Sequence, residues 1–326
     1  MRVLITGMGG ELGTRVANLV EADPRFTDIH GIDAFPPRRR ITRTSFHRID
    51  PRDRRKIVQL VRDIDPELIL HLGVYEPHAR VASTPARLFT AASAVSTLGA
   101  ASSGASLRHI VVRSGIEVYG RRRGGPTRPD ESAEPVPTTP WGRSLAHVEE
   151  VAAEAGQVAS VPVTSLRMAP VVGPSVPSPL GRYLRLPAVA VNPVVELPFQ
   201  LLHQEDAAAA VLAATRNQHD GPLNVVGSGA VTASQAAVRG RRFPVPTAGW
   251  GWRAAAIASE LLGAPLPPHT RELLVRGAVA DGARALELLG IDPRPTDDVI
   301  TQLYRWETVA HPEVARSPGI ARRAGT

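Results

Sequence analysis

Gly7, Gly10 and Gly13 are the first residues of this chain whose type and spacing point to chemistry. They follow the apolar run 3–5 and precede a stretch with the apolar periodicity of a helix. Glycines at this spacing allow a tight turn and a close approach of the backbone to a pyrophosphate, while the helix start supplies N–H groups. The pattern predicts a dinucleotide-binding turn, whose contacts we assign to Gly7, Met8, Gly10, Glu11, Leu12 and Gly13.

The proton donor that usually accompanies such a turn is absent from the sequence. Oxidoreductases built on this turn usually use a Tyr-x-x-x-Lys pair, in which the lysine lowers the pKa of the tyrosine. The only lysine is Lys56, and no tyrosine has a lysine four residues later. The tyrosines are Tyr75, Tyr119, Tyr183 and Tyr304. The chain therefore looks like an oxidoreductase scaffold without its usual proton donor.

Alternating strand and helix signals in the first half of the chain must position these residues. Buried strands are predicted at 3–6, 29–33, 68–72, 110–114 and 163–168, and helices at 13–21, 54–64, 87–101 and 142–155. This rhythm predicts an α/β fold, a Rossmann-type doubly wound parallel sheet with a smaller C-terminal substrate-binding lobe. We assign residues 1–172 and 200–229 to the dinucleotide-binding domain. The lobe takes residues 173–199 and 230–326, with helices predicted at 252–262 and 280–289.

The form T-G-x-x-G-x-x-G at residues 6–13 resembles the extended short-chain dehydrogenases/reductases of the nucleotide-sugar epimerase and dehydratase type. Six further segments resemble motifs of that family in the same order, at 31–33, 48–50, 70–73, 117–120, 166–174 and 202–206. The resemblance implies that Asp33 holds the ribose hydroxyls of the adenosine and that Asp50 contacts the adenine. It also implies cofactor contacts at Pro51, Leu72, Gly73, Val112 and Pro170.

Departures from the family concentrate where its chemistry takes place. The family's serine, tyrosine and lysine correspond to Gly115, Trp141 and Leu145, so no member of the triad is present. The indole N–H of Trp141 donates a hydrogen bond but does not titrate. Glu117 matches the catalytic glutamate of the sugar-nucleotide dehydratases, although Ile116 stands where those enzymes need an aspartate. The candidate catalytic residues are Ser114, Trp141 and Glu117, and a purely structural role stays open for each.

Three functions are compatible with this pattern. The leading hypothesis is an atypical NAD(P)H-dependent ketoreductase that acts on an aromatic polyketide-like, angucyclinone-type ketone. Its proton would come from a substrate hydroxyl or from water, so the protein need only orient and desolvate the substrate. The alternatives are a nucleotide-sugar epimerase or dehydratase relative and a catalytically inactive NAD(P)-binding sensor.

The choice between NAD(H) and NADP(H) depends on two features near the second strand. Asp33 favours NAD(H), because a carboxylate repels the 2′-phosphate of NADP(H). The run Arg38 to Arg40 follows closely and could neutralise that carboxylate. We therefore predict that both dinucleotides are accepted, with Arg38 as the contact to the 2′-phosphate.

Composition limits the other classes of function. The net charge of +7 comes largely from arginines in loops rich in proline and glycine, without interleaved aromatic residues, so we expect no nucleic-acid partner. The absence of cysteine excludes a disulfide framework and a cysteine-ligated metal, and we expect no metal site. No apolar segment reaches the ~20 residues that a membrane helix needs. We expect a cytoplasmic monomer or homodimer that binds a small ketone and no membrane.

Overall fold

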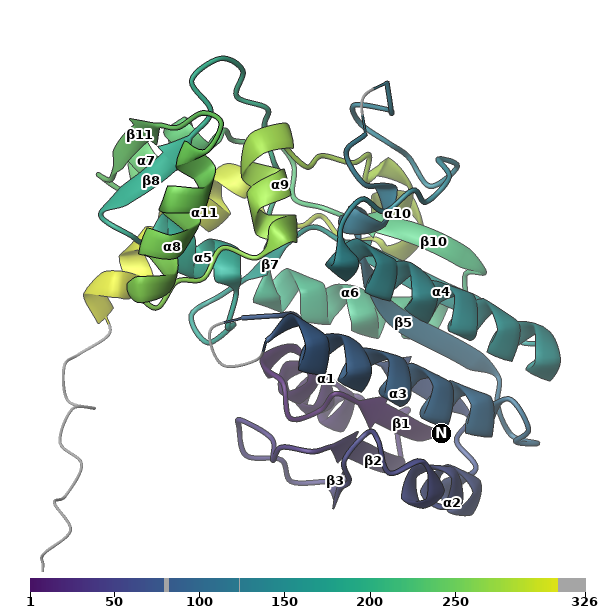
Figure 1. Ribbon diagram of the computed structural model, residues 1–326. Coiled ribbons are helices and arrows are strands. Elements are labelled where there is room, and N and C mark those ends of the chain that lie inside the picture. Colours follow the sequence, from purple (N-terminus) through teal and green to yellow (C-terminus); the bar gives the residue numbers. More distant parts are fainter. Residues whose placement is uncertain (79–81, 123, 310–326) are drawn as a thin grey trace, which may run out of the picture.

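The computed structural model describes residues 1–78, 82–122 and 124–309, and a parallel sheet of seven strands lies at its centre (Figure 1). The strand order is β10-β6-β5-β4-β1-β2-β3, and every neighbouring pair is parallel. The strands are β1 (Arg2–Thr6), β2 (Asp28–Asp33), β3 (Thr44–Arg48), β4 (Leu68–His71), β5 (His109–Gly115), β6 (Val163–Met168) and β10 (Gly221–Val225). This architecture confirms the predicted Rossmann-type α/β fold.

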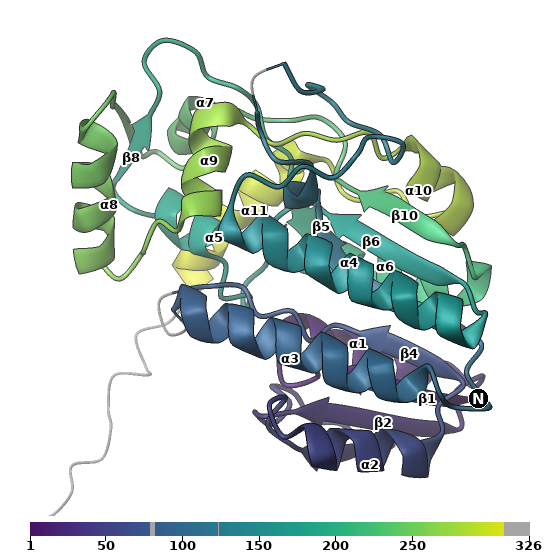
Figure 2. The same cartoon turned by 45° about the vertical axis from the view of Figure 1, so that its right-hand side comes forward.

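Helices cover both faces of the sheet. On one face α2 (Arg54–Ile64), α3 (Ser83–Ala101) and α4 (Pro140–Ala159) lie side by side, and on the other α1 (Glu11–Ala22) packs against α6 (Gln204–Asn217) (Figure 2). Because helices cover both faces, the apolar strands in the middle of the sheet are buried from both sides. No helix among the described residues is long and apolar enough to cross a membrane.

The second half of the chain builds a smaller lobe beyond the carboxyl ends of the strands (Figure 1). It contains α5 (Pro179–Leu184), β8 (Ala188–Val191), α7 (Ala233–Arg239), β11 (Phe243–Pro246), α8 (Gly251–Leu261), α9 (Pro268–Arg276) and α11 (Thr296–Val309). The short strands β7 (Val171–Val172) and β9 (Leu202–His203) pair where the chain leaves the sheet and returns to it. The C-terminal residues 310–326, which the sequence assigned to the lobe, lie outside the described residues.

One predicted lobe segment packs against the sheet domain instead. The helix α10 (Ala283–Leu289) contacts β10 and α6, although the sequence placed all residues from 230 onward in the lobe. It begins three residues later than the predicted helix at 280–289, because Gly282 stands at its N-cap. The chain therefore returns from the lobe to the sheet domain once more than the predicted domain boundaries imply.

Local sequence explains how the elements next to the site begin. Thr139 caps α4 by accepting a hydrogen bond from the N–H of Gly142, and Pro140 occupies the first turn, where its missing N–H costs nothing. A single 3₁₀ turn, η1 (Ile116–Tyr119), follows β5 directly. These two starts bring the residues around Glu117 and Trp141 to the same end of the sheet.

Candidate active site

The glycine turn joins β1 to α1 and packs against the end of β4. Gly7 has a φ of +68°, and a Cβ on it would lie 2.4 Å from the carbonyl oxygen of Leu72. A Cβ on Gly13 would lie 2.2 Å from the carbonyl oxygen of Gly7, whereas a Cβ on Gly10 would meet only that oxygen, at 3.3 Å. The turn is therefore tight on its inner side and open at Gly10, which fits the approach of a pyrophosphate to the start of α1.

Asp33 stands beside this turn at the end of β2. Its residue surface is only 3% exposed, and its carboxylate accepts hydrogen bonds from the N–H of Gly9 at 3.0 Å and of Phe35 at 3.1 Å. Burial raises the pKa of the carboxyl group, because these donors only partly replace the lost water. The group is a fixed acceptor at the strand end, which fits its predicted role at the ribose hydroxyls.

The remaining residues predicted to contact the cofactor differ in their surroundings. Met8, Leu12, Pro51 and Leu72 are buried, and the half-buried Asp50 pairs with Arg52. Gly73 donates its N–H to Thr6, and the carbonyl of Pro170 accepts a hydrogen bond from Leu202. Val112, like Met8, is fully buried, so the side chains of both face the core. Arg38 donates its backbone N–H to Thr14 at 3.1 Å, and its side chain borders a cavity shared with the lobe.

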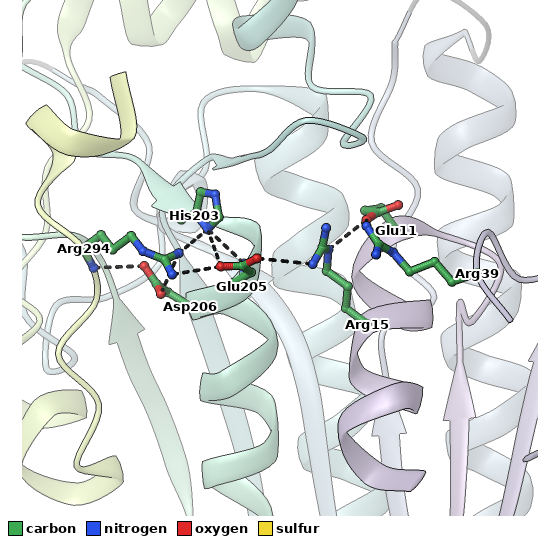
Figure 3. Close-up of polar contacts among 7 residues, drawn as sticks. All are labelled: Glu11, Arg15, Arg39, His203, Glu205, Asp206 and Arg294. Atoms are coloured by element: carbon green, nitrogen blue, oxygen red, sulfur yellow. Dashed lines mark hydrogen bonds and ion pairs between the residues drawn. The ribbon is translucent and has the colours of Figure 1, made fainter. Parts of the chain in front are cut away.

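A network of charged side chains lies at the start of α1 (Figure 3). The buried carboxylate of Glu11 accepts from Arg15 at 2.8 Å and from Arg39 at 3.1 Å. Arg15 also lies 3.7 Å from Glu205, which pairs with Arg294 at 2.8 Å. The network continues to Asp206 and His203 at the start of α6, and it links the predicted pyrophosphate site to the segment that precedes α11.

At the position of the missing triad serine, another side chain fills the space. A Cβ on Gly115 would lie 2.3 Å from Oε2 of Glu117 and 3.1 Å from Cδ1 of Leu145. Among the described residues, Glu117 makes no ion pair and no hydrogen bond to another side chain. Burial raises the pKa of its carboxyl group, and the charges of His269 and Arg113 oppose that rise. A carboxyl group with a raised pKa thus stands where the family's serine would be.

Trp141 and the lobe helix α9 meet beside this carboxyl group. The Trp141 side chain is only 6% exposed, and its ring centroid lies 5.7 Å from that of His269. His269 Nε2 lies 3.1 Å from Oε1 of Glu76, which follows β4. The floor of the site combines the residues Gly115, Trp141, Leu145 and Pro170 with four charged or titratable groups, which are Glu76, Arg113, Glu117 and His269.

Sequence reasoning missed three of these groups. Glu76 and His269 are 193 residues apart, so only the packing of the lobe on the sheet domain brings them together. Arg113 had a signal, because it is a charged residue inside the apolar strand β5. Burial lowers its pKa, and the charges of Glu76 and Glu117 oppose that change.

Ser114 belongs to a different network, buried between β5 and α4. Its hydroxyl donates to Oε1 of Glu149 at 2.5 Å, and Glu149 pairs with Arg167 at 2.7 Å. Arg167 also donates to the hydroxyl of Tyr119 at 3.0 Å. The hydroxyl of Ser114 is therefore engaged inside the sheet domain, which corrects its assignment as a candidate catalytic residue.

A cavity of about 470 Å³ lies between the sheet domain and the lobe. Three arginines from two segments border it: Arg38 after β2, and Arg182 and Arg185 at the end of α5. Its other lining includes the segment 172–178, which carries the predicted Gly173-Pro174 motif. Among the described residues no carboxylate borders the cavity, so this part of its lining carries net positive charge.

Comparison with known families identifies the chain. A model described as the NAD dependent epimerase/dehydratase family matches residues 3–226. The chain belongs to this family. Uncharacterized proteins of Mycobacterium tuberculosis and Mycobacterium bovis are 29% identical over 308 residues, which covers 90% of this chain and 80% of theirs. The resemblance to extended short-chain dehydrogenases/reductases is thus confirmed at the level of the family.

Solved structures share the fold. A UDP-glucose 4-epimerase of Thermotoga maritima in complex with UDP-glucose is similar at a TM-score of 0.70 and 17% identity, covering 95% of this chain and 99% of that one. A UDP-glucuronic acid 4-epimerase of Bacillus cereus in complex with UDP-glucuronic acid and NAD gives a TM-score of 0.71 and 17% identity, covering 95% of this chain and 100% of that one. At this identity the likeness establishes the arrangement of the sheet and the smaller C-terminal lobe.

Proposed function

We propose that this protein binds NAD(H) at its glycine turn and catalyses hydride transfer on a phosphate-bearing, nucleotide-sugar-like substrate, with Glu117 as the group that gives or takes the proton. Bound NAD(H) supplies or accepts the hydride. The backbone around Gly10 holds the pyrophosphate, and Asp33 holds the adenosine ribose. This assignment adopts the nucleotide-sugar alternative of the sequence analysis in preference to the ketoreductase.

The place of Glu117 carries the proposal. Burial raises the pKa of the Glu117 carboxyl group, and a raised pKa is the direction of change that suits a carboxyl group for proton transfer. Its position beside Gly115 and Leu145 puts it at the site of the family's serine and lysine, close to the reacting carbon expected for a substrate over the nicotinamide. Trp141 cannot titrate, so Glu117 is the better candidate for proton transfer.

Two observations support a substrate that carries phosphate. The cavity between sheet domain and lobe presents Arg38, Arg182 and Arg185, and none of its described lining residues is a carboxylate. Arginine suits phosphate recognition because of its planar set of donors. The similar solved structures contain UDP-glucose or UDP-glucuronic acid. A polar, charged floor around Glu117 also suits a hydroxyl-rich sugar, because each sugar hydroxyl can find a partner there.

The test uses purified protein with NAD⁺ or NADH and the probes UDP-glucose and UDP-glucuronic acid. We expect turnover with a UDP-sugar, and Glu117→Gln should lower kcat on the order of 10²-fold while leaving NADH affinity unchanged. Glu134→Gln, on the exposed connection before α4, is the matched control. Unchanged kcat in Glu117→Gln would remove Glu117 from proton transfer.

The ketoreductase is a second candidate, favoured by the loss of both Tyr and Lys at Trp141 and Leu145. A substrate with its own hydrogen-bonded hydroxyl would need no protein acid, so its reduction should be insensitive to Glu117→Gln. NADH consumption with a quinone-like ketone, and none with UDP-sugars, would favour this function. NADH binding without turnover of either class would favour a sensor.

A further inference from the structure

We infer that Glu11 makes the dinucleotide site selective for NAD(H) over NADP(H), by holding Arg39 at the start of α1. The inference rests on the proposed function, because it assumes that a dinucleotide lies across the glycine turn. The sequence predicted Arg38 as the contact to the 2′-phosphate of NADP(H), whereas this inference gives the choice between the two dinucleotides to Glu11 and Arg39.

The burial of Glu11 makes its hold on Arg39 strong. Only 3% of the Glu11 side chain is exposed, and Oε1 accepts hydrogen bonds from both Arg15 and Arg39. A buried carboxylate that loses a cationic partner is strongly destabilised, because water cannot replace that partner. Arg39 is therefore held at its guanidinium group, although 44% of its side chain is exposed.

Arg15 alone cannot neutralise Glu11. Its guanidinium lies 2.8 Å from Glu11 and also 3.7 Å from Glu205 (Figure 3). Glu205 in turn shares Arg294 with Asp206. The network holds three carboxylates and three guanidinium groups. If Arg39 moved to another anion, the network would keep three carboxylates and only two guanidinium groups, and the buried Glu11 would be left with one shared partner. This charge balance favours the Arg39–Glu11 pair.

The ribose end of the site, by contrast, presents an anion without a cation. Asp33 accepts hydrogen bonds from two backbone N–H groups, and no arginine among the described residues pairs with it. A 2′-phosphate placed beside this carboxylate would meet like charge, which costs affinity. Arg39, if released from Glu11, would be a cation from the loop after β2 that can offset this repulsion.

The other arginines near this loop are placed differently. The side chain of Arg38 borders the cavity shared with the lobe, and its backbone is fixed on Thr14. Arg48 donates from Nε to the carbonyl of Ala34 at 3.1 Å, so it is held by the backbone. Arg40 is exposed in the same loop. Arg40→Ala and Arg48→Ala are therefore matched controls for Arg39→Ala.

The experiment measures the affinities of NADH and NADPH by titration calorimetry. Wild type should bind NADH more than about tenfold more tightly than NADPH. Glu11→Gln removes a negative charge beside the pyrophosphate, so both affinities should rise, but the gap between them should narrow by about fivefold as Arg39 becomes available to the 2′-phosphate. Adding Arg39→Ala to Glu11→Gln should restore the wild-type ratio of NADH to NADPH affinity, and adding Arg48→Ala or Arg40→Ala should not.

An unchanged NADH-to-NADPH ratio in Glu11→Gln overturns the inference, as does a narrowed ratio that survives Arg39→Ala. Arg39→Ala alone keeps the test decisive if Glu11→Gln does not fold: it should weaken both dinucleotides equally, and a loss confined to NADPH overturns the inference. Equal binding of both dinucleotides by wild type also overturns the inference, but it leaves the proposed function standing. Binding of neither would overturn the proposed function as well.

Discussion

The carboxylate of Glu117 occupies the space that a side chain on Gly115 would need. A Cβ at that position would lie 2.3 Å from Oε2 of Glu117, closer than any real contact, and 3.1 Å from Leu145. The two residues are therefore coupled: the serine of the family's triad and this rotamer of Glu117 exclude each other. The loss of the serine and the placement of the glutamate are a single structural feature of this chain.

The coupling predicts non-additive stabilities at these two positions. Gly115→Ala should lower the free energy of unfolding by about 1–3 kcal/mol, the usual cost of overpacking. Glu117→Ala empties the space. Adding Gly115→Ala to that variant should therefore lower the free energy of unfolding much less than Gly115→Ala does in wild type. Urea denaturation of the four proteins measures the coupling, and additive losses would show that Glu117 swings away freely.

Five of the seven strands of the sheet could be predicted, because each of the five contains a short apolar run; the two that were not are the edge strands β3 and β10. The predicted strand at 163–168 and helix at 54–64 match β6 and α2 in the structure. The edge strand β3 was missed, since its residues Thr44 to Arg48 carry no apolar run and pair only because β2 offers a free edge. The helix α9 was missed because its start is rich in proline, although proline suits the first turn of a helix.

The site could be predicted only where its chemistry is local in sequence. Gly7, Gly10 and Gly13 lie within one turn and one helix start, so their spacing carries the geometry. The pairing of His269 with Glu76 depends on how the lobe packs, which no short pattern encodes. Ser114 was misjudged because its neighbours in sequence give no sign of Glu149 and Arg167, which come from α4 and β6 and engage its hydroxyl.

Gly10 and Gly13 should respond differently to substitution. Gly13→Ala would place a Cβ 2.2 Å from the carbonyl oxygen of Gly7, so we expect a lower melting temperature together with weaker NADH binding. Gly10→Val should fold and lose NADH affinity by at least about tenfold, because its side chain would occupy the space that we assign to the pyrophosphate. Gly99→Val on α3, with no atom within 4 Å of its Cβ, is the control. Wild-type NADH affinity in Gly10→Val would refute the cofactor assignment.

Ser114→Ala tests whether the hydroxyl of Ser114 has a structural or a catalytic role. Its loss removes one hydrogen bond to Glu149, which retains Arg167, so the free energy of unfolding should fall by about 1 kcal/mol. NADH affinity should not change. A loss of NADH affinity at unchanged stability, seen by calorimetry and thermal melting, would instead return Ser114 to the ligand site.

Restoring the family pair should not restore the family chemistry. Leu145 is only 1% exposed, so the ammonium of Leu145→Lys would be buried, its pKa would fall and the fold would lose several kcal/mol of stability. Trp141→Tyr would also give up part of the packing on His269. We expect the double variant to melt at a lower temperature and to oxidise NADH no faster than wild type. A large rise in kcat would show that the missing pair limits the native protein.

The stability of the fold should fall as pH falls from 6.5 towards 4, through two buried histidines. Burial lowers the pKa of His71 and of His109 from 6.5 to about 4. Between these values the unfolded chain binds more protons than the folded one, so acid favours unfolding, and each histidine should cost about 2 kcal/mol at pH 5. The raised pKa values of Asp33 and Glu117 act in the opposite direction, because there the folded state binds more protons.

A variant at His71 isolates the histidine contribution from the carboxyl groups. His71→Asn keeps a polar atom near the hydroxyl of Thr6, which lies 3.0 Å from Nδ1, but it cannot titrate. The substitution itself should lower the free energy of unfolding at pH 7. The further decrease in the free energy of unfolding between pH 7 and pH 5 should be smaller than in wild type by about 2 kcal/mol. The exposed His147→Asn should leave that loss unchanged. Urea titrations at pH 7, 6 and 5 measure it, and parallel curves for His71→Asn and wild type would mean that His71 is protonated in the folded protein.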